Sequence, residues 1–331
     1  GVTMIQDCAY NANAVEAYRE LAEEGRLTAR FRSVYLMEPG KARETLKTLK
    51  ERKSKDDSAL DFRIDTVKIF AEGPFSLLEP YERSFIEDNG LSEDYNGKLF
   101  WDDEEFVYVA SAAMKAGFNV HVHAMGDKAV KQSIACLSEA QKQVGHPMRN
   151  VVAHLMLVRD EDIEAMKRAG IIANLQPRWM VHDADIDAME RMVGVRAERC
   201  YPQRGFIDRG IKVTYGTDYP VTPPPDTMHE IQCAMTRSVF PDAPSYEKYR
   251  GKVLGDEKPA TLEEAVKALS VNSAYQMLLE NEAGSIETGK SADLVVLDSD
   301  LERTAPQEIY GVKVKKTIFK GKIVYEGEEE M

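Results

Sequence analysis

The sequence predicts an α/β protein built as a (β/α)8-type TIM barrel, with about seven strands present. Three observations support this fold class. Short β-rich runs alternate with longer helical patterns along most of the chain, which is typical of parallel β–α–β units. Polar residues stand at the ends of the β-rich runs. The 331 residues leave room for a barrel of roughly 200–250 residues and a smaller β-rich unit.

Seven strands are expected, separated by helical segments. The strands are predicted near residues 2, 30, 65, 118, 150, 171 and 211. The predicted helices cover residues 14–22, 41–52, 102–115, 127–144, 160–170, 198–209, 227–237 and 262–279. Asp102 and Asp160 are the expected N-caps of two helices, because a carboxylate accepts hydrogen bonds from free N–H groups of a first turn.

The strand count alone does not decide between a barrel and a doubly wound open sheet, because seven strands suit an open sheet as well. The positions of the polar residues favour the barrel. They lie in or at the C-terminal ends of six different predicted strands, as Asp7, Lys68, His123, His154, Gln176 and Asp218. In a barrel, active sites are built at that rim.

Two further segments depart from the alternation. Glu72–Trp101 is long and irregular, and we expect it to be a loop that covers the substrate. The tail carries three β-rich runs with a hairpin turn at Lys320-Gly321-Lys322. Because two or three strands are not stable alone in water, these strands should pack on the barrel or on a partner sheet. We therefore divide the chain into a barrel unit, residues 1–282, and a C-terminal unit, residues 283–331.

Composition excludes several classes of protein. The net charge is −13 and the pI is about 5.1, which argues against a nucleic-acid-binding surface. No apolar run reaches the ~18 residues of a membrane span. The four cysteines are scattered, which favours reduced thiols and a cytoplasmic location. The chain begins at Gly1 within an apolar run, so we expect the natural N-terminus to lie upstream.

Three histidines are candidates for a metal centre. His121 and His123 are two residues apart in a predicted strand, so both point to the same face. His154 ends the next strand and should lie beside His123 at the rim. Such histidines can be structural, but two at neighbouring strand ends favour a metal, which imidazole binds well. We predict His123 and His154 as ligands and His121 as a pocket residue.

Asp218 and Lys68 complete the candidate centre. Asp218 follows a strand and precedes Pro220. It either caps the turn or acts as a ligand and general acid/base beside the histidines, and we predict the second role. Lys68 lies within an apolar strand, where a charged amine is costly. It is a snorkelling lysine, a neutral amine or a lysine carboxylated by CO₂ to bind metal, and the residue pattern alone leaves these open.

A second group of side chains is predicted to shape a pocket for a small-molecule substrate. It consists of His121, Gln176, Arg178, Trp179, His182, Tyr219 and Arg237. Arg237 is interpreted as a ligand for a substrate carboxylate or as an arginine on a helix surface.

Six segments, taken in order, match a known family pattern. They are Val67–Phe70, His121–Val130, Val152–Leu155, Asn174–Trp179, Tyr215–Val221 and Ala283–Leu297. This combination resembles the amidohydrolase superfamily, specifically its amidohydrolase-3 branch, which contains N-substituted formamide deformylases and AepA-type exoenzyme regulatory proteins. The resemblance extends from Gly1 to about Gly327.

The resemblance implies a metal-dependent hydrolase that acts on an amide or formamide C–N bond. It implies a TIM barrel flanked by a small β-sandwich, of which residues 283–331 form the C-terminal half. It also implies one or two divalent ions, commonly zinc. Lys68 would be a carboxylated bridging ligand, His123 and His154 further ligands, and Asp218 a ligand that also carries protons.

The chain departs from the family pattern in one respect. The family's first barrel strand carries a His-x-His metal pair, whereas the first histidine here is His121. Gly1–Asp7 resembles the family's second strand, so we expect a C-terminal portion of a longer protein that is inactive without the upstream strand. The alternatives are a non-catalytic regulatory or binding protein on this scaffold and, more weakly, a barrel isomerase or lyase. Exposed sandwich edges favour a homodimer.

Overall fold

The seven predicted strands form one parallel sheet in the computed structural model, which describes residues 1–9, 11–53, 61–73 and 75–327. The strands are β1 (Met4–Gln6), β2 (Arg30–Met37), β3 (Phe62–Phe70), β4 (Asn119–Ala124), β5 (Val151–His154), β6 (Ile172–Leu175) and β7 (Val213–Tyr215). Each pairs in parallel with its neighbour in sequence. This order is singly wound, as in a barrel, so the doubly wound alternative is wrong.

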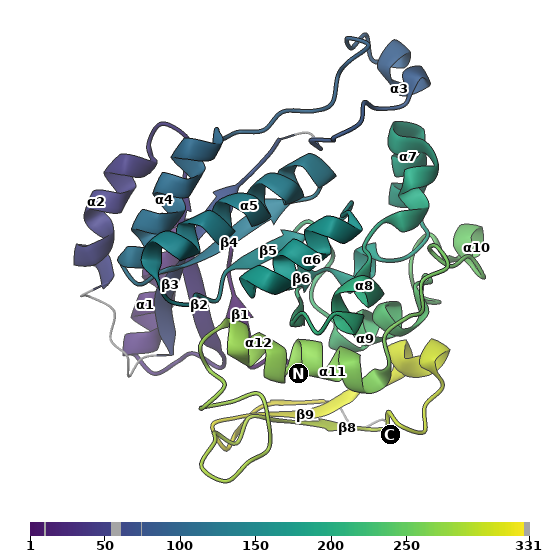
Figure 1. Ribbon diagram of the computed structural model, residues 1–331. Helices are drawn as coiled ribbons and strands as arrows, with labels where there is room; N and C mark the ends of the chain where they lie inside the picture. The colour runs from purple at the N-terminus through teal and green to yellow at the C-terminus, as the bar shows by residue number, and fades with distance from the viewer. Residues whose placement is uncertain (10, 54–60, 74, 328–331) are drawn as a thin grey trace.

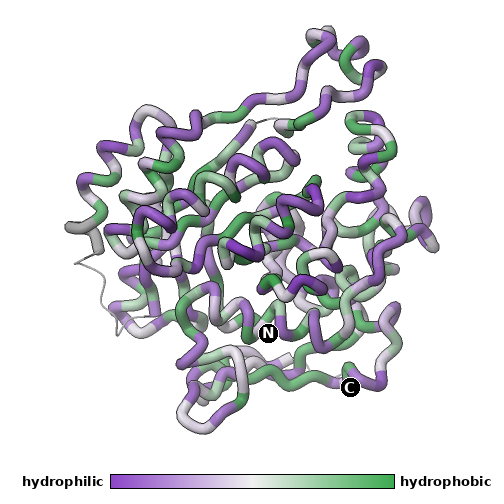
Figure 2. The backbone as a smooth tube through the Cα atoms, in the orientation of Figure 1, coloured by the Kyte–Doolittle hydropathy of each residue, from purple (hydrophilic) through white to green (hydrophobic). Residues whose placement is uncertain are grey.

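Helices connect the strands and cover the sheet on the outside (Figure 1). Between strands lie α1 (Ala12–Glu23), α2 (Ala42–Lys53), α3 (Arg83–Asp88), α4 (Asp103–Lys115), α5 (Asp127–Val144), α6 (Asp160–Ala169), α7 (Ala184–Val193) and α8 (Gln203–Asp208). After β7 come α9 (Thr227–Thr236), α10 (Tyr246–Tyr249), α11 (Leu262–Leu269) and α12 (Val271–Gln276). Figure 2 shows both hydrophobic and hydrophilic residues along the outer helices, as expected for helices with one buried face.

Three details of the predicted helices are wrong. The expected helix over 198–209 is a 3-10 helix, η2 (Gly194–Arg199), followed by α8, because Pro202 lacks the N–H that a continuous helix needs there. The expected helix over 262–279 breaks at Ser270, which has φ −118° and ψ −88°. The N-cap of α6 is Arg159, and Asp160 is the first helical residue. The Asp102 cap of α4 is confirmed.

A glutamine bridges the two edges of the parallel sheet. Within the described residues, β1 and β7 are edge strands. Gln276 of α12 accepts a hydrogen bond from Thr214 Oγ1 of β7 at 2.6 Å and donates from Nε2 to Gln6 Oε1 of β1 at 2.6 Å. The amide therefore ties both edges to the helix that lies over them, which fixes the curvature of the sheet.

The C-terminal residues form a separate antiparallel sheet below α11 and α12 in Figure 1. Its strands are β8 (Leu294–Leu297), β9 (Val314–Phe319) and β10 (Lys322–Glu326), preceded at β9 by η3 (Pro306–Gly311). The hairpin turn predicted at Lys320-Gly321-Lys322 is present between β9 and β10, and Lys320 and Gly321 both have positive φ, as a two-residue turn requires. A buried ion pair between Arg30 and Asp293 joins this sheet to the barrel. Residues 328–331 of the predicted C-terminal unit lie outside the described residues.

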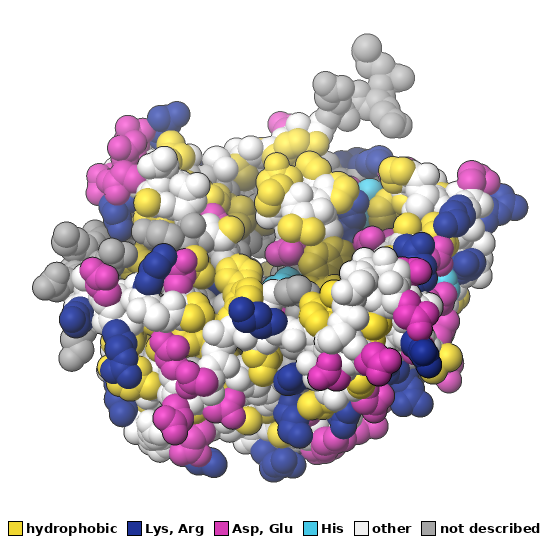
Figure 3. Space-filling view, turned by 90° about the horizontal axis from the view of Figure 1, so that it is seen from above, with side chains coloured by type: hydrophobic (Ala, Val, Ile, Leu, Met, Phe, Trp, Pro, Cys, Tyr) yellow, Lys and Arg dark blue, Asp and Glu magenta, His cyan; other side chains and the backbone are white. Residues whose placement is uncertain are grey.

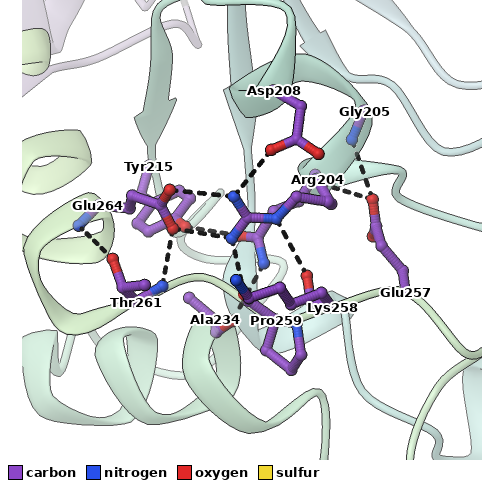
Figure 4. A network of polar contacts seen from close by, with 11 residues as sticks. Arg204, Gly205, Asp208, Tyr215, Ala234, Glu257, Lys258, Pro259, Thr261 and Glu264 are labelled. Carbon is purple, nitrogen blue, oxygen red and sulfur yellow. Dashed lines mark hydrogen bonds and ion pairs between the residues drawn. The ribbon is translucent and has the colours of Figure 1, made fainter.

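An arginine network fixes the position of β7 (Figure 4). The Arg204 guanidinium donates two hydrogen bonds to Glu264, at 3.0 and 2.8 Å, and one to Asp208 at 3.1 Å. Tyr215 at the end of β7 donates to Gln203 Oε1 at 2.6 Å. The strand that leads to Asp218 is thus bound to α8, and α8 is bound to α11.

The free energy of unfolding should depend on pH because of the ion pair between Arg204 and Glu264. Hydrogen bonds from Arg204 lower the pKa of Glu264 to about 2. A lowered pKa means that the stabilisation is complete above about pH 4.5 and is lost as the pH falls towards 2. We expect Glu264→Gln to lower the free energy of unfolding by about 2–3 kcal/mol at pH 7. Urea unfolding at pH 7, 5 and 3.5 measures this, and a gap that stays constant with pH would contradict it.

No helix among the described residues has the length and apolar character needed to cross a bilayer. All four cysteines are free thiols. Hydrophobic side chains of the central strands, Val67, Ile69, Val120 and Val122, are buried beneath the helices. Their neighbours in sequence point to the opposite face of the sheet, and these neighbours build the candidate site.

Candidate functional site

The strand register brings Lys68, His121 and His123 together inside the barrel. Lys68 of β3 lies opposite His121 of β4, so their side chains share a face. His123 is two residues further along β4 and points the same way. In a view from above, a histidine is visible at the bottom of a central hollow lined by hydrophobic side chains (Figure 3). Because Lys68 and His123 stand near the last residues of β3 and β4, the predicted polar cluster lies at the carboxyl end of the strands.

Lys68 is almost completely buried, with 4% of its surface exposed. Its Nζ lies 3.0 Å from His121 Nδ1 and 5.1 Å from the centre of the Phe70 ring. Burial lowers the pKa of Lys68 and also holds the pKa of His121 well below its ordinary value. Snorkelling to solvent is therefore wrong for Lys68, and an amine with weakened basicity faces a neutral imidazole.

His154 reaches the cluster only because its backbone leaves the strand conformation. In the ladder it lies opposite Ala124, on the face away from His123. Its φ is 77°, in the left-handed region that side chains rarely adopt. As a result, its ring lies 4.6 Å from the His123 ring, centre to centre. Strained backbone of this kind concentrates at functional sites.

A chain of hydrogen bonds fixes the orientation of the His154 ring. Gln176 Nε2 donates to Asn174 Oδ1 at 3.0 Å, which leaves Gln176 Oε1 facing His154 Nδ1 at 2.9 Å. Nδ1 must therefore carry the proton, and Nε2 keeps its lone pair. Trp179 stacks on the same ring at 5.3 Å. The structure thus brings Gln176 and Trp179 to the centre as supports of His154.

Burial keeps the histidines neutral. It lowers the pKa of His123 to about 4, and it places the pKa of His154 well below the ordinary value. Neutral imidazole is the form that binds metal ions. The rings are therefore ready to act as ligands at neutral pH without releasing protons.

Asp218 stands beyond β7 with φ 55°, also in the left-handed region. Its carbonyl accepts a hydrogen bond from Val221 N–H at 2.8 Å, which closes the turn after the strand. Burial raises the pKa of Asp218, and the charge of Lys68 acts in the opposite direction. The carboxyl therefore lies within electrostatic reach of the lysine in the cluster.

The remaining predicted pocket residues lie elsewhere or at the surface. Tyr219 is exposed, and Arg178 donates to Pro224 O at 3.3 Å. His182 is 3.5 Å from Asp187, through Nε2 and Oδ1.

Arg237 is buried at 1% exposure, so its interpretation as a helix-surface arginine is wrong. Its guanidinium donates to the carbonyls of Leu254, Tyr201 and Cys200 and pairs with Glu257 at 3.2 Å. All three side-chain nitrogens of Arg237 therefore donate hydrogen bonds to protein groups.

Glu72 was not among the predicted site residues, although it follows β3 as directly as Asp218 follows β7. Its buried carboxylate accepts backbone N–H groups of Ser76, of Met125 at 2.5 Å and of Gly126 at 2.9 Å. A Cβ at Gly126 would lie 2.2 Å from Ser76 O, so only glycine fits. Glu72 therefore fastens the start of the 72–101 segment to the loop that follows His123.

Glu72→Gln tests this fastening. The glutamine amide group would face a backbone N–H, so at least one buried donor loses its acceptor, which costs about 1–3 kcal/mol. We expect a lower free energy of unfolding and faster proteolysis within residues 75–101. The exposed Glu302→Gln serves as the control. Equal proteolysis rates in both variants would contradict the role given to Glu72.

The chemistry of the buried side chains fits a divalent cation. Two neutral imidazoles, a carboxylate and a weakly basic amine are the donor types that Zn²⁺ accepts, with Lys68 requiring carboxylation to offer oxygen. Gln176 accepts a hydrogen bond from His154 Nδ1, and metal-binding histidines usually have such a partner at the nitrogen that does not bind the metal. One group of three His, Cys, Asp or Glu residues in the described part of the chain has ligand atoms within 4.8 Å of one another. It consists of His182, Glu190 and Glu198, and it does not include the buried histidines.

The fold and the buried cluster define a (β/α)-barrel protein with its polar centre at the carboxyl end of the strands. The chain belongs to the amidohydrolase family, whose family model matches residues 1–325. This confirms the resemblance found in the sequence.

Known proteins similar to this chain support the same assignment. It is 28% identical to Bacillus subtilis YtcJ over 265 residues, 78% of this chain and 47% of that protein. It is 25% identical to an N-substituted formamide deformylase of Arthrobacter pascens over 230 residues, 70% of this chain and 41% of that protein.

A metal-dependent hydrolase from Pyrococcus horikoshii OT3 has the same fold, with a TM-score of 0.73 and 22% identity, over 93% of this chain and 57% of that one. The chain therefore spans about half the length of the proteins it matches.

Proposed function

We propose that this chain carries the centre of a metal-dependent amidohydrolase that cleaves a C–N bond of an amide or formamide substrate. Lys68, His123, His154 and Asp218 would hold the ion, which we take to be Zn²⁺. The observation that carries the proposal is the convergence of Lys68 and the neutral histidines at the ends of adjacent strands. The deformylase similarity supports the substrate class.

Each residue has a separate task in this proposal. A divalent ion bound here would polarise the scissile carbonyl and lower the pKa of water. Gln176 holds the proton on His154 Nδ1, so that Nε2 faces the site. Asp218, at the rim, accepts a proton on its carboxylate from water and transfers it to the leaving nitrogen.

Lys68 is suited to carboxylation. The neutral amine is the form that reacts with CO₂, and burial favours that form. Carboxylation would replace an amine by an anionic oxygen donor beside His123. His121 accepts or donates at Nδ1 to hold the lysine side chain in place.

Hydrolysis assays test the proposal directly. The chain, stripped of metal and then loaded with Zn²⁺ in bicarbonate, is assayed with N-formyl amines and with simple amides. We expect release of formate or carboxylate from a protein extended upstream by the strand that carries the His-x-His pair, and none from the 331-residue chain alone. In the extended protein, Asp218→Asn should abolish the release and His146→Asn, at an exposed histidine, should leave it unchanged. An extended, zinc-loaded protein that binds these amides without hydrolysing them would instead favour a non-catalytic binding protein.

A further inference from the structure

We propose that Phe70 and Trp179 select the substrate, an amide that carries a neutral, planar apolar group beside its C–N bond. This assignment rests on the proposed function, since it names the substrate class of the same centre. Phe70 is the last residue of β3. Trp179 is the last residue of the 3-10 helix η1 (Pro177–Trp179), which follows β6.

Four aromatic rings form a continuous row across the centre. Phe70 lies opposite His123 in the strand ladder, and the centres of their rings are 5.2 Å apart. The His123 and His154 rings are 4.6 Å apart. Trp179 stacks on His154 at 5.3 Å, with an angle of 15° between the ring planes. The two candidate ligands therefore occupy the middle of the row, with Phe70 and Trp179 at its ends.

Phe70 is an exposed aromatic side chain on the face that carries the buried cluster. Lys68, two residues before it on the same face, is 4% exposed, whereas Phe70 is 39% exposed. Phe70 stands at the carboxyl end of its strand, where the central hollow is lined by hydrophobic side chains (Figure 3). Covering an apolar ring that is open to solvent is favourable, so the ring offers binding free energy to an apolar ligand.

The spacing of the rings limits where the apolar group of the substrate can lie. The ring centres of Phe70 and Trp179 are 5.2 and 5.3 Å from the neighbouring histidine rings. Aromatic rings attract one another at centre-to-centre separations of about 4.5–7 Å. With the C–N bond held at the histidines, a planar group joined to the amide directly or through one carbon atom would reach one of the two rings.

The cations near the row favour a neutral group. Arg237, predicted as a possible ligand for a substrate carboxylate, donates to three backbone carbonyls. Arg178 donates to Pro224 O at 3.3 Å, and Lys68 is buried against His121. These three cations are already engaged with the protein. A carboxylate on the apolar group would therefore lose its hydration without gaining a partner, which is costly.

Ligand binding by the metal-stripped 331-residue chain tests the proposal without requiring hydrolysis. Ligand-observed NMR titrations compare benzamide with cyclohexanecarboxamide, whose ring is puckered, and with 4-carbamoylbenzoate, which adds a carboxylate. We expect benzamide to bind at least about threefold more tightly than either, the size of an aromatic pairing contribution.

Substitution of Phe70 separates the aromatic ring from apolar bulk. Phe70→Ala should lower the affinity for benzamide by about threefold to tenfold. Phe70→Leu keeps an apolar side chain and should lose the preference for benzamide over cyclohexanecarboxamide. The matched control is Tyr108→Ala, at an aromatic side chain of α4 that is 43% exposed, and it should bind benzamide as the unmodified chain does.

Three results would overturn the proposal. They are an absence of benzamide binding, binding of cyclohexanecarboxamide or 4-carbamoylbenzoate that is as tight as that of benzamide, and equal benzamide affinities in Phe70→Ala and Tyr108→Ala. The thermal midpoint of each variant checks that it is folded. A preference for benzamide together with no hydrolysis by the upstream-extended protein would contradict the proposed function alone.

Discussion

Replacing His154 by alanine should lower the Zn²⁺ affinity of the buried centre more than any other single change. Loss of an outer partner such as Gln176 typically costs about 10–100-fold in metal affinity. Loss of the ligand itself should exceed the upper end of that range, to more than about 100-fold. The reason is geometric, because the left-handed backbone at His154 directs this ring toward His123.

Competition with a chromophoric zinc chelator measures this affinity. Gln176→Ala should give an intermediate loss, because the His154 ring then lacks the acceptor at Nδ1. His146→Ala, at an exposed histidine, is the matched control. Equal affinities for His154→Ala and His146→Ala would show that the ring is not a ligand.

Replacing Arg237 by alanine should give the largest loss of stability, about 3–5 kcal/mol. Removing one partner of a buried ion pair leaves the other charge without compensation. Here Glu257 would lose its guanidinium partner, and the carbonyls of Cys200, Tyr201 and Leu254 would lose their donors. Arg237→Lys should recover little of this, because an ammonium cannot reproduce the planar set of donors.

Urea unfolding at pH 7 measures the Arg237 effect. The control is Arg303→Ala, whose side chain is 88% exposed and pairs with Asp300 at 3.4 Å, an arrangement worth about 0–1 kcal/mol. A substrate-binding role for Arg237 predicts the opposite pattern, with weaker substrate binding and near-normal stability. Such a result would show that Arg237 binds substrate and does not stabilise the core.

The barrel strands were predictable because one local pattern repeats along the chain. Val67 and Ile69 alternate with Lys68, and Val120 and Val122 alternate with His121. Alternation of this kind records which face is covered by helices and which faces the interior. The prediction failed where the continuity of a helix depends on one residue. At Ser270 the backbone leaves the helical conformation, so α11 and α12 replace the single predicted helix.

The centre was predictable only in part. The polar residues at strand ends made Lys68, His123, His154 and Asp218 candidates, and the structure places Lys68 and the histidines close together. Glu72 also follows a strand end and was not predicted. Arg237 carried no local sign of its contacts, because its partners lie in segments 17–37 residues away along the chain. Long-range partners of this kind are not encoded in the pattern around a residue.

The sequence by itself determined the alternation of strands and helices, the polar residues at strand ends and the family. Those features follow from which side chains are apolar and how they repeat, and both are local properties. The tertiary structure decided the singly wound order, the left-handed turn that brings His154 to His123, and the fastening of Glu72. It also placed Phe70 and Trp179 at the two ends of the histidine pair. These depend on how separate segments pack, because packing sets which buried polar groups find partners and which are left to bind a ligand.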